Sequence, residues 1–160
     1  MKIRPIAEKD WPTLKNIVQA QEHFRPAEIR VALEIIDFAL KQQREEDYII
    51  RLVEGEDHEI WGYVCYGKAP LTDAVYDLYW IIVHPAYQNQ GAGSFLLNYA
   101  QQDLKRRQAR LLLIETSSLP AYAKPRAFYA KHGFQEIARI KDYYEQGDDK
   151  IIFGKVLNSP

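Results

Sequence analysis

The sequence predicts one domain of the α/β (α+β) class, with helices on both faces of a mixed, mostly antiparallel sheet of about seven strands. Two observations predict this class. β-prone runs joined by short polar turns occur over residues 48–66 and 134–157, which is typical of antiparallel strands. Between them, a strand, a polar loop, an amphipathic helix and a second strand span 74–116, and this unit requires a crossover that makes one strand pair parallel. The 160 residues suffice for one core, so residues 1–160 are expected to form a single domain.

The N-terminal quarter of the chain predicts a strand followed by two helices. Residues Lys2–Ile6 alternate polar and apolar side chains, as a short strand does. Asp10 is expected to cap a helix that ends near Gln21. After a break at 23–26, apolar residues recur at helical spacing over 29–40, which predicts a second amphipathic helix.

The middle and the end of the chain predict the sheet. Strands are expected over 48–54, 59–66 and 74–83, and a helix over 91–107 follows them. A buried-type strand, a short helix that ends at Gly133, and two closing strands complete the pattern, over 111–116, 125–131, 134–143 and 150–157. The predicted order is βααβββαβαββ.

Composition excludes several classes of protein. Apolar residues make up 47% of the chain and the formal net charge is −1, which argues against disorder and against the positive surface that nucleic-acid binding needs. No apolar run approaches the roughly 20 residues of a membrane-spanning helix. The first residues turn polar without the apolar core of a secretory signal. We therefore expect a cytoplasmic monomer or homodimer with neither a nucleic acid nor a membrane as partner.

Cysteine and histidine usage indicates neither a disulfide nor a metal site. Cys65 is the only cysteine, so no intrachain disulfide can form, which fits a reducing compartment. The four histidines lack the spacing of metal ligands with each other or with Cys65. No bound metal is expected.

The stretch from Val83 to Ser94 is the first candidate for chemistry. Gly91 and Gly93 lie where a helix begins, and the first turn of a helix offers unpaired backbone N–H groups to a phosphate. No Lys-Ser or Lys-Thr follows as in a P-loop, and Leu96 stands where a dinucleotide fingerprint has its third glycine. Alone, the pattern fits either a pyrophosphate site or an ordinary loop at a helix start.

Two motifs resemble those of the GNAT superfamily of acetyl-CoA-dependent N-acetyltransferases. The first is Trp-Ile-Ile-Val-His-Pro at 80–85 followed by Gln88-x-x-Gly91-x-Gly93, and the second is the run at 127–134. The order of elements is also similar to that family's fold. The resemblance implies an enzyme that transfers the acetyl group of acetyl-CoA, its cosubstrate, to a primary amine of a small molecule by direct attack in a ternary complex. Two alternatives stay open: a peptide or protein α-amine as acceptor, and a non-catalytic acyl-CoA-binding regulatory module.

The resemblance also implies where the cosubstrate binds. Backbone groups of β-strand residues would pair with its pantetheine arm, and N–H groups of the loop and first helical turn would hold its pyrophosphate. The implied residues are Ile81, Ile82, Val83, Gln88, Asn89, Gln90, Gly91, Ala92, Gly93, Ser94 and Tyr129. Many relatives have glycine or a basic residue where this chain has Asn89 and Gln90, so side-chain charge contributes less here.

Acetyl transfer to an amine requires a base and benefits from an acid. Tyr129 matches the family position whose hydroxyl lies near the cofactor sulfur, although it can also simply pack its helix onto the sheet. Asp77 and Glu115 both resemble bases used in the family, and both are expected near the opening of the sheet. Either one can instead be a strand-end carboxylate paired with a basic group or a backbone N–H.

The acceptor side is expected between the segment after the first helix and the last hairpin. The resemblance implies contacts from Phe24, Tyr143 and Tyr144, whose aromatic faces suit a cationic amine. Carboxylates at Asp148 and Asp149 would suit it too. A Gly-Asp-Asp turn is, however, most often a solvent-exposed hairpin tip, and we interpret 147–149 in that way.

Overall fold

A computed structural model describes residues 1–42 and 47–158 of the chain. Its seven-stranded sheet has the strand order β1-β2-β3-β4-β5-β7-β6, and only β4 and β5 pair in parallel. The fold class and the element order predicted from the sequence are both confirmed. The elements are β1 (Lys2–Pro5), α1 (Trp11–Gln19), α2 (Pro26–Gln42), β2 (Ile49–Glu54), β3 (Ile60–Lys68), β4 (Val75–Val83), α3 (Ala92–Arg106), β5 (Leu111–Ser117), α4 (Ala123–Lys131), β6 (Gln135–Glu145) and β7 (Asp148–Val156).

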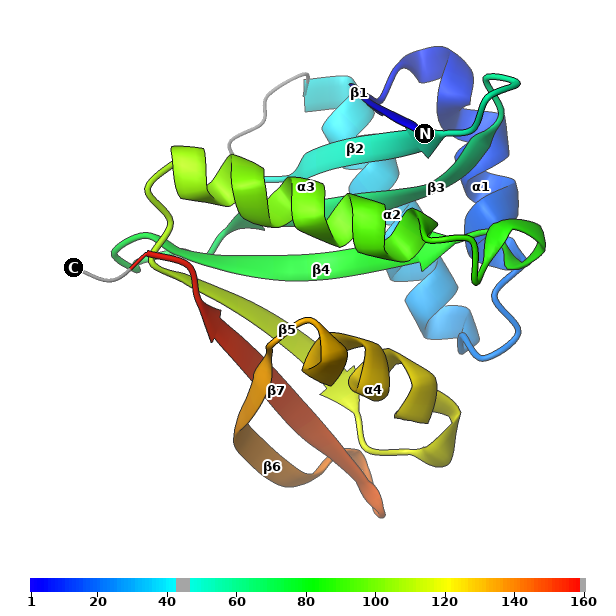
Figure 1. Ribbon diagram of the computed structural model, residues 1–160. Coiled ribbons are helices and arrows are strands. Elements are labelled where there is room, and N and C mark those ends of the chain that lie inside the picture. The colour runs from blue at the N-terminus through cyan, green and yellow to red at the C-terminus, as the bar shows by residue number, and fades with distance from the viewer. Residues whose placement is uncertain (43–46, 159–160) are drawn as a thin grey trace.

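Two pairs of helices sandwich the sheet. Figure 1 shows α1 and α2 behind it and α3 and α4 in front. One apolar core lies under α3 and includes Leu96, Leu97 and Ala100, and the other lies under α1 and α2 and includes Leu14 and Ile36. Strands β2, β3 and β4 therefore contribute side chains to two separate cores, as expected for strands buried on both faces.

The sheet opens between β4 and β5. Their parallel ladder covers only Val75–Leu78 against Leu111–Ile114. Beyond that point the end of β5 pairs with β7, and Figure 1 shows β4 and β5 diverging. The opening, which we call the gap, leaves backbone groups of β4 without a β5 partner within the described strands.

A β-bulge in β4 lies at the point where the gap begins. Cys65 pairs with Trp80 and Tyr66 pairs with Leu78, so Tyr79 is an extra residue opposite β3. A bulge places two consecutive side chains on one face. Tyr79 and Trp80 accordingly both pack on the core under α1 and α2, whereas Leu78 packs on the core under α3.

Asp10 directly precedes α1, but the prediction that its side chain caps the helix is wrong. The side chain of Asp10 forms no capping hydrogen bond to α1. Its Oδ2 instead accepts hydrogen bonds from Ala7 N at 2.8 Å and from Arg4 Nη1 at 2.7 Å. The carboxylate stabilises the turn η1 (Glu8–Asp10) before the helix because a charged partner on β1 holds it there.

No helix within residues 1–42 and 47–158 is long and apolar enough to cross a membrane.

Candidate active site

The loop between β4 and α3 presents the first turn of a helix beside the end of β4 (Figure 1). Gly91 precedes α3 with a φ of 86°, a left-handed conformation that glycine adopts without a steric penalty. Among the described residues, no side chain caps this helix. Its first N–H groups, on Ala92, Gly93 and Ser94, therefore remain available to an anion, and the helix dipole favours negative charge there.

Side-chain amides shape this loop from within. Gln88 Nε2 donates to Val83 O at 3.1 Å, and Gln90 Nε2 donates to Ala86 O at 3.2 Å. Gln21, at the end of the first helical segment, also donates from Nε2 to Val83 O at 3.2 Å. Gln88 and Gln90 thus support the loop conformation, and Asn89 stands in it with a φ of 61°.

The backbone of β4 alternates between β3 and the gap. His84 N donates to Trp61 O at 2.8 Å, which by antiparallel alternation turns both backbone groups of Ile82 toward β3. The backbone groups of Ile81 and Val83 then face the gap. Of the three residues predicted to pair with an extended ligand, Ile81 and Val83 are placed for that role and Ile82 is not. The Val83 carbonyl already accepts the two amide bonds described above.

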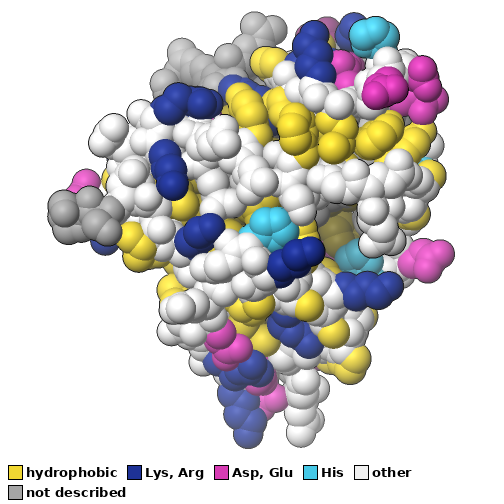
Figure 2. Space-filling view, viewed as in Figure 1, with side chains coloured by type: hydrophobic (Ala, Val, Ile, Leu, Met, Phe, Trp, Pro, Cys, Tyr) yellow, Lys and Arg dark blue, Asp and Glu magenta, His cyan; other side chains and the backbone are white. Residues whose placement is uncertain are grey.

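Basic residues on α4 supply charge that the loop itself lacks. The helix carries Lys124, Arg126 and Lys131 and no acidic residue. The helix and the residue that caps its end contact the start of α3. His132 Nε2 lies 3.1 Å from Ser94 Oγ, and a Cβ added to Gly93 would lie 3.6 Å from the Phe128 ring. Figure 2 shows Lys and Arg side chains around the hollow between α3 and α4. This source of positive charge was missed because it lies more than thirty residues downstream of the loop.

Tyr129 lies on α4 and is 8% exposed. Its ring contacts Phe134 and Phe153, with centroids 6.2 and 6.0 Å away. Burial raises the pKa of the Tyr129 hydroxyl, so it is fully protonated at neutral pH. The side chain belongs to the core under α3, on the opposite face of the sheet from the two candidate bases.

The structure brings Asp77 and Glu115 together on the face of the sheet that carries α1 and α2. Lys150 Nζ lies 2.6 Å from Glu115 Oε2 and 4.4 Å from the centroid of the Tyr143 ring. Burial raises the pKa of Asp77, the nearby charge of Glu115 raises it further, and Lys150 opposes both effects. Glu115 is therefore an ion-pair partner, and Asp77 is a half-buried carboxylate with an increased proton affinity.

Comparison with known proteins decides the family. The model of the acetyltransferase (GNAT) domain matches residues 45–136. The chain belongs to the GNAT acetyltransferase family. A protein from Desulfovibrio desulfuricans described as a GNAT-family acetyltransferase is 35% identical, with 98% of this chain and 99% of that chain covered and a TM-score of 0.89. No curated protein sequence gives a comparable match.

More distant solved structures share the fold of this GNAT acetyltransferase. The ribosomal-protein-S18-alanine N-acetyltransferase of Escherichia coli is 21% identical with a TM-score of 0.77, over 99% of this chain and 95% of that one. An aminoglycoside 6'-N-acetyltransferase in complex with coenzyme A is 14% identical with a TM-score of 0.76, over 100% and 99%. The GNAT fold binds acyl-CoA, and the uncapped α3 turn, the basic α4 and the gap of this chain fit such a group.

The aromatic residues predicted on the acceptor side of this GNAT acetyltransferase lie in two places. Phe24 packs on Trp80 of β4, with ring centroids 5.4 Å apart. Tyr143 and Tyr144 on β6 contact each other edge to face at 5.0 Å. On the face of the sheet that carries α1 and α2, Phe24 thus lines the β4 side and the two tyrosines line the β6–β7 side.

Polar contacts that the sequence did not predict connect those two sides of this acetyltransferase. The hydroxyl of Tyr122, in the turn η3 (Pro120–Tyr122), donates to the carboxylate of Glu28 at 2.7 Å. Arg25 Nη1 lies 3.6 Å from Asp148 Oδ2. The interpretation of 147–149 as an exposed tip is wrong for Asp148, which is 0% exposed because Ser117 Oγ donates to its Oδ1 at 2.6 Å and holds it inward.

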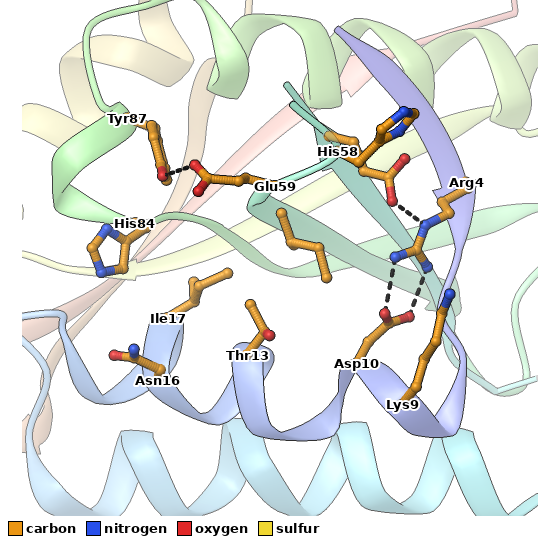
Figure 3. Close-up of a pocket in the computed structure, with 12 residues that line it drawn as sticks. Arg4, Lys9, Asp10, Thr13, Asn16, Ile17, His58, Glu59, His84 and Tyr87 are labelled. Atoms are coloured by element: carbon orange, nitrogen blue, oxygen red, sulfur yellow. Dashed lines mark hydrogen bonds and ion pairs between the residues drawn. The ribbon is translucent and has the colours of Figure 1, made fainter. Parts of the chain in front are cut away.

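A separate polar cavity of about 670 Å³ lies between α1, the β2–β3 turn and the loop after β4 (Figure 3). Its acidic residues are already paired: Arg4 Nη1 lies 2.7 Å from Asp10, Arg4 also contacts Glu54, and Tyr87 donates to Glu59. Asp77, Glu115 and Tyr129 do not line it, so this cavity of the GNAT acetyltransferase is distinct from the gap. In residues 1–42 and 47–158, no group of His, Cys, Asp and Glu is arranged to hold a metal ion.

Proposed function

We propose that this chain transfers the acetyl group of acetyl-CoA to a primary amine of a small molecule. The observation that supports it is the position of Asp77, a carboxylate of raised pKa beside the opening of the sheet, with Glu115 held in an ion pair with Lys150. A base of this kind is what an ammonium acceptor needs, because the amine must lose a proton before it can attack.

The chain offers groups that complement the phosphates and the extended arm of the cosubstrate. The first turn of α3 and the basic side chains of α4 suit its phosphates, and the backbone of Ile81 and Val83 suits an extended amide-bearing arm in the gap. When bound, acetyl-CoA supplies a thioester whose acetyl group is activated for transfer. The chain binds and orients this group, and the core residues around the gap exclude water from it.

Asp77 is the proposed base, and Tyr129 is proposed to act at the departing sulfur. Asp77 accepts one proton from the acceptor ammonium, the new N–C bond forms as the C–S bond breaks, and the second proton passes from the acetylated nitrogen to the thiolate, so that CoA leaves as a thiol. The raised pKa of Tyr129 makes full proton transfer to a thiolate uphill, since a thiol has a pKa of about 8.5. We therefore propose that the Tyr129 hydroxyl donates a hydrogen bond to the sulfur as charge develops there.

A peptide or protein α-amine is the second candidate acceptor. The structural likeness to the Escherichia coli ribosomal-protein-S18-alanine N-acetyltransferase favours testing it. The contacts of Tyr122 with Glu28 and of Arg25 with Asp148 cross the acceptor side, which favours a small acceptor over an extended peptide.

The proposal is tested in two steps. Thermal stabilisation by acetyl-CoA is measured first, and thiol release is then followed with a panel of small amines and of N-terminal peptides. Small amines are expected to be acetylated, with Asp77→Asn strongly impaired and the exposed turn variant Asp73→Asn unchanged. Stabilisation without turnover on any amine would leave a non-catalytic acyl-CoA-binding module, and no stabilisation by any acyl-CoA would refute the proposed function.

A further inference from the structure

Asp148 is a fully buried carboxylate, and one of its two oxygens accepts no hydrogen bond from the described residues. Its Oδ1 accepts hydrogen bonds from Ser117 Oγ at 2.6 Å and from Ser118 N at 3.2 Å. Among the described residues, none donates a hydrogen bond to its buried Oδ2. Arg25 Nη1, at 3.6 Å, is close enough for an ion pair and too far for a hydrogen bond. Burying a carboxylate oxygen in this state is costly, so the site is suited to a further donor.

A cationic side chain already occupies the space next to that oxygen. The guanidinium of Arg25 lies 5.5 Å from the centroid of the Tyr144 ring, and its Nε lies 3.3 Å from Glu28 Oε2. Two carboxylates and an aromatic face thus surround one positive charge. Because the Arg25 side chain is 39% exposed, it can rotate away from this place into solvent.

The Arg25 guanidinium lies over the same face of the sheet as Asp77, the proposed base. Alternate residues of β5 face the same side, so Leu113, Glu115 and Ser117 share the face that carries α1 and α2. Asp77 is opposite Leu113 in the β4–β5 ladder, and Asp148 contacts Ser117. Successive residues on one face of a strand are about 7 Å apart, so Leu113 and Ser117, which mark the positions of Asp77 and Asp148, are about 14 Å apart with Glu115 between them.

We propose that the place held by the Arg25 guanidinium is a subsite for a second cationic group of the acceptor. The inference rests on the proposed function, with the reacting amine at Asp77 and Glu115. The second ammonium donates to Asp148 Oδ2 and Glu28 and lies on the Tyr144 ring, and Arg25 swings out. The acceptor is therefore a flexible diamine. An extended alkyl chain of about six carbons spans the ~14 Å between Asp77 and Asp148 when each ammonium lies within hydrogen-bond distance of its own carboxylate.

The balance of charge favours a cation over an anion here. Four carboxylates lie on this face, on Glu28, Asp77, Glu115 and Asp148, and two basic side chains, Arg25 and Lys150, contact them. A substrate carboxylate drawn to Arg25 would add negative charge beside Asp148 Oδ2, which accepts no hydrogen bond from the described residues. A second ammonium that replaces the Arg25 guanidinium keeps one positive charge there and can donate the hydrogen bond to Asp148 Oδ2 that Arg25 does not make.

The test measures binding without turnover. Calorimetric titration of the CoA-saturated protein uses a series of unbranched α,ω-diaminoalkanes from ethane to octane, with the matching monoamines and ω-amino acids. Diamines of intermediate length are expected to bind about tenfold more tightly than monoamines. Equal affinity of monoamines, or tighter binding of ω-amino acids, would overturn the proposal. Diamine binding without acetyl transfer would uphold the subsite and refute the proposed enzymatic function.

Variants identify the subsite. Arg25→Ala removes the internal competitor and is expected to tighten diamine binding several-fold. Arg30→Ala, at an exposed arginine on α2, the helix that follows Arg25, is expected to leave it unchanged. Asp148→Asn is expected to weaken diamine binding about tenfold or more. If that variant does not fold, Tyr144→Leu serves instead, because Tyr144 is partly exposed and its ring contacts the cation. Weaker diamine binding in Arg25→Ala would overturn the proposal.

Discussion

Asp77 and Glu115 show how two carboxylates on one face of a sheet acquire different properties. The pair lies beside a single lysine, and Lys150 contacts Glu115 at 2.6 Å. Asp77 is left with burial and a neighbouring negative charge, which both raise its pKa. The sequence left the choice of base open between these two residues, because strand positions alone do not show which one Lys150 reaches.

Asp77→Asn is expected to change stability and activity in opposite directions. The folded protein holds Asp77 at a raised pKa, so its ionisation destabilises the fold as the pH rises above 3.8, the ordinary pKa of an aspartate side chain. The variant should melt about 1–3 °C higher at pH 7, with no gain at pH 3. Its kcat should fall about a hundredfold or more if Asp77 is the base. Thermal scans at both pH values and steady-state kinetics check this, and a lower melting temperature at pH 7 would contradict it.

Glu115→Gln is expected to shift the pH profile while leaving Asp77 in place. The substitution removes a negative charge that raises the pKa of Asp77 and leaves Lys150, which lowers it. The acid limb of kcat should therefore move to lower pH. The profile is compared with that of Glu136→Gln, which removes the partner of Arg139 on exposed β6. An unchanged acid limb would show that Glu115 does not act through Asp77.

At the scale of elements, periodicity in the sequence was enough to predict the fold. The strands and helices have strong patterns, and their ends differ from prediction by one to a few residues. Contacts of the site were predictable from the sequence only where the residues lie within one motif. Tyr122 and Glu28 are 94 residues apart, and no spacing rule reveals that their side chains meet. Turn composition indicated an exposed Asp148, and a hydrogen bond from Ser117 on the neighbouring strand β5, 31 residues earlier in the chain, holds it inward.

Gly91→Ala tests the start of α3. The φ of 86° places an alanine in the left-handed region, at a cost of about 1 kcal/mol, and a relaxed loop would turn the first N–H groups of the helix away from a phosphate. Lower stability and weaker acetyl-CoA binding are both expected, measured by denaturant unfolding and calorimetry.

Gly147→Ala provides the matched control. Gly147 has a φ of 87° and an open surrounding, so the same strain arises far from α3. Similar destabilisation with unchanged acetyl-CoA affinity is expected from it. If both variants lost affinity equally, the first turn of α3 would not be the phosphate site.

At the scale of the whole molecule, the gap divides the sheet into two parts that touch at both ends. The short β4–β5 ladder joins them at one end. Side-chain contacts join them at the other end, from Glu28 at the start of α2 to η3 and from Arg25 just before α2 to β7. The second connection crosses the acceptor side, so the entry of an acceptor and the separation of the two parts are linked.

Tyr122→Phe is expected to loosen that second connection. Removing the hydroxyl takes one donor from the Glu28 carboxylate, which keeps its contacts with Arg25, and should lower the free energy of unfolding by about 1–2 kcal/mol. Amide hydrogen exchange should rise in η3 and at the start of α2 more than in the β4–β5 ladder. Tyr143→Phe, at an exposed tyrosine of β6, is the control, and equal exchange in the two variants would argue against the connection.

The bulge at Tyr79 has a further consequence for how this site can vary. Tyr79 and Trp80 face the same side of the sheet. The other side chains of β4, before and after the bulge, therefore point to the same faces whether or not Tyr79 is present. The distance along the chain from Asp77 to the phosphate loop can therefore change by one residue without moving any side chain to the opposite face. β4 can in this way adjust the reach between base and cosubstrate while both cores stay packed.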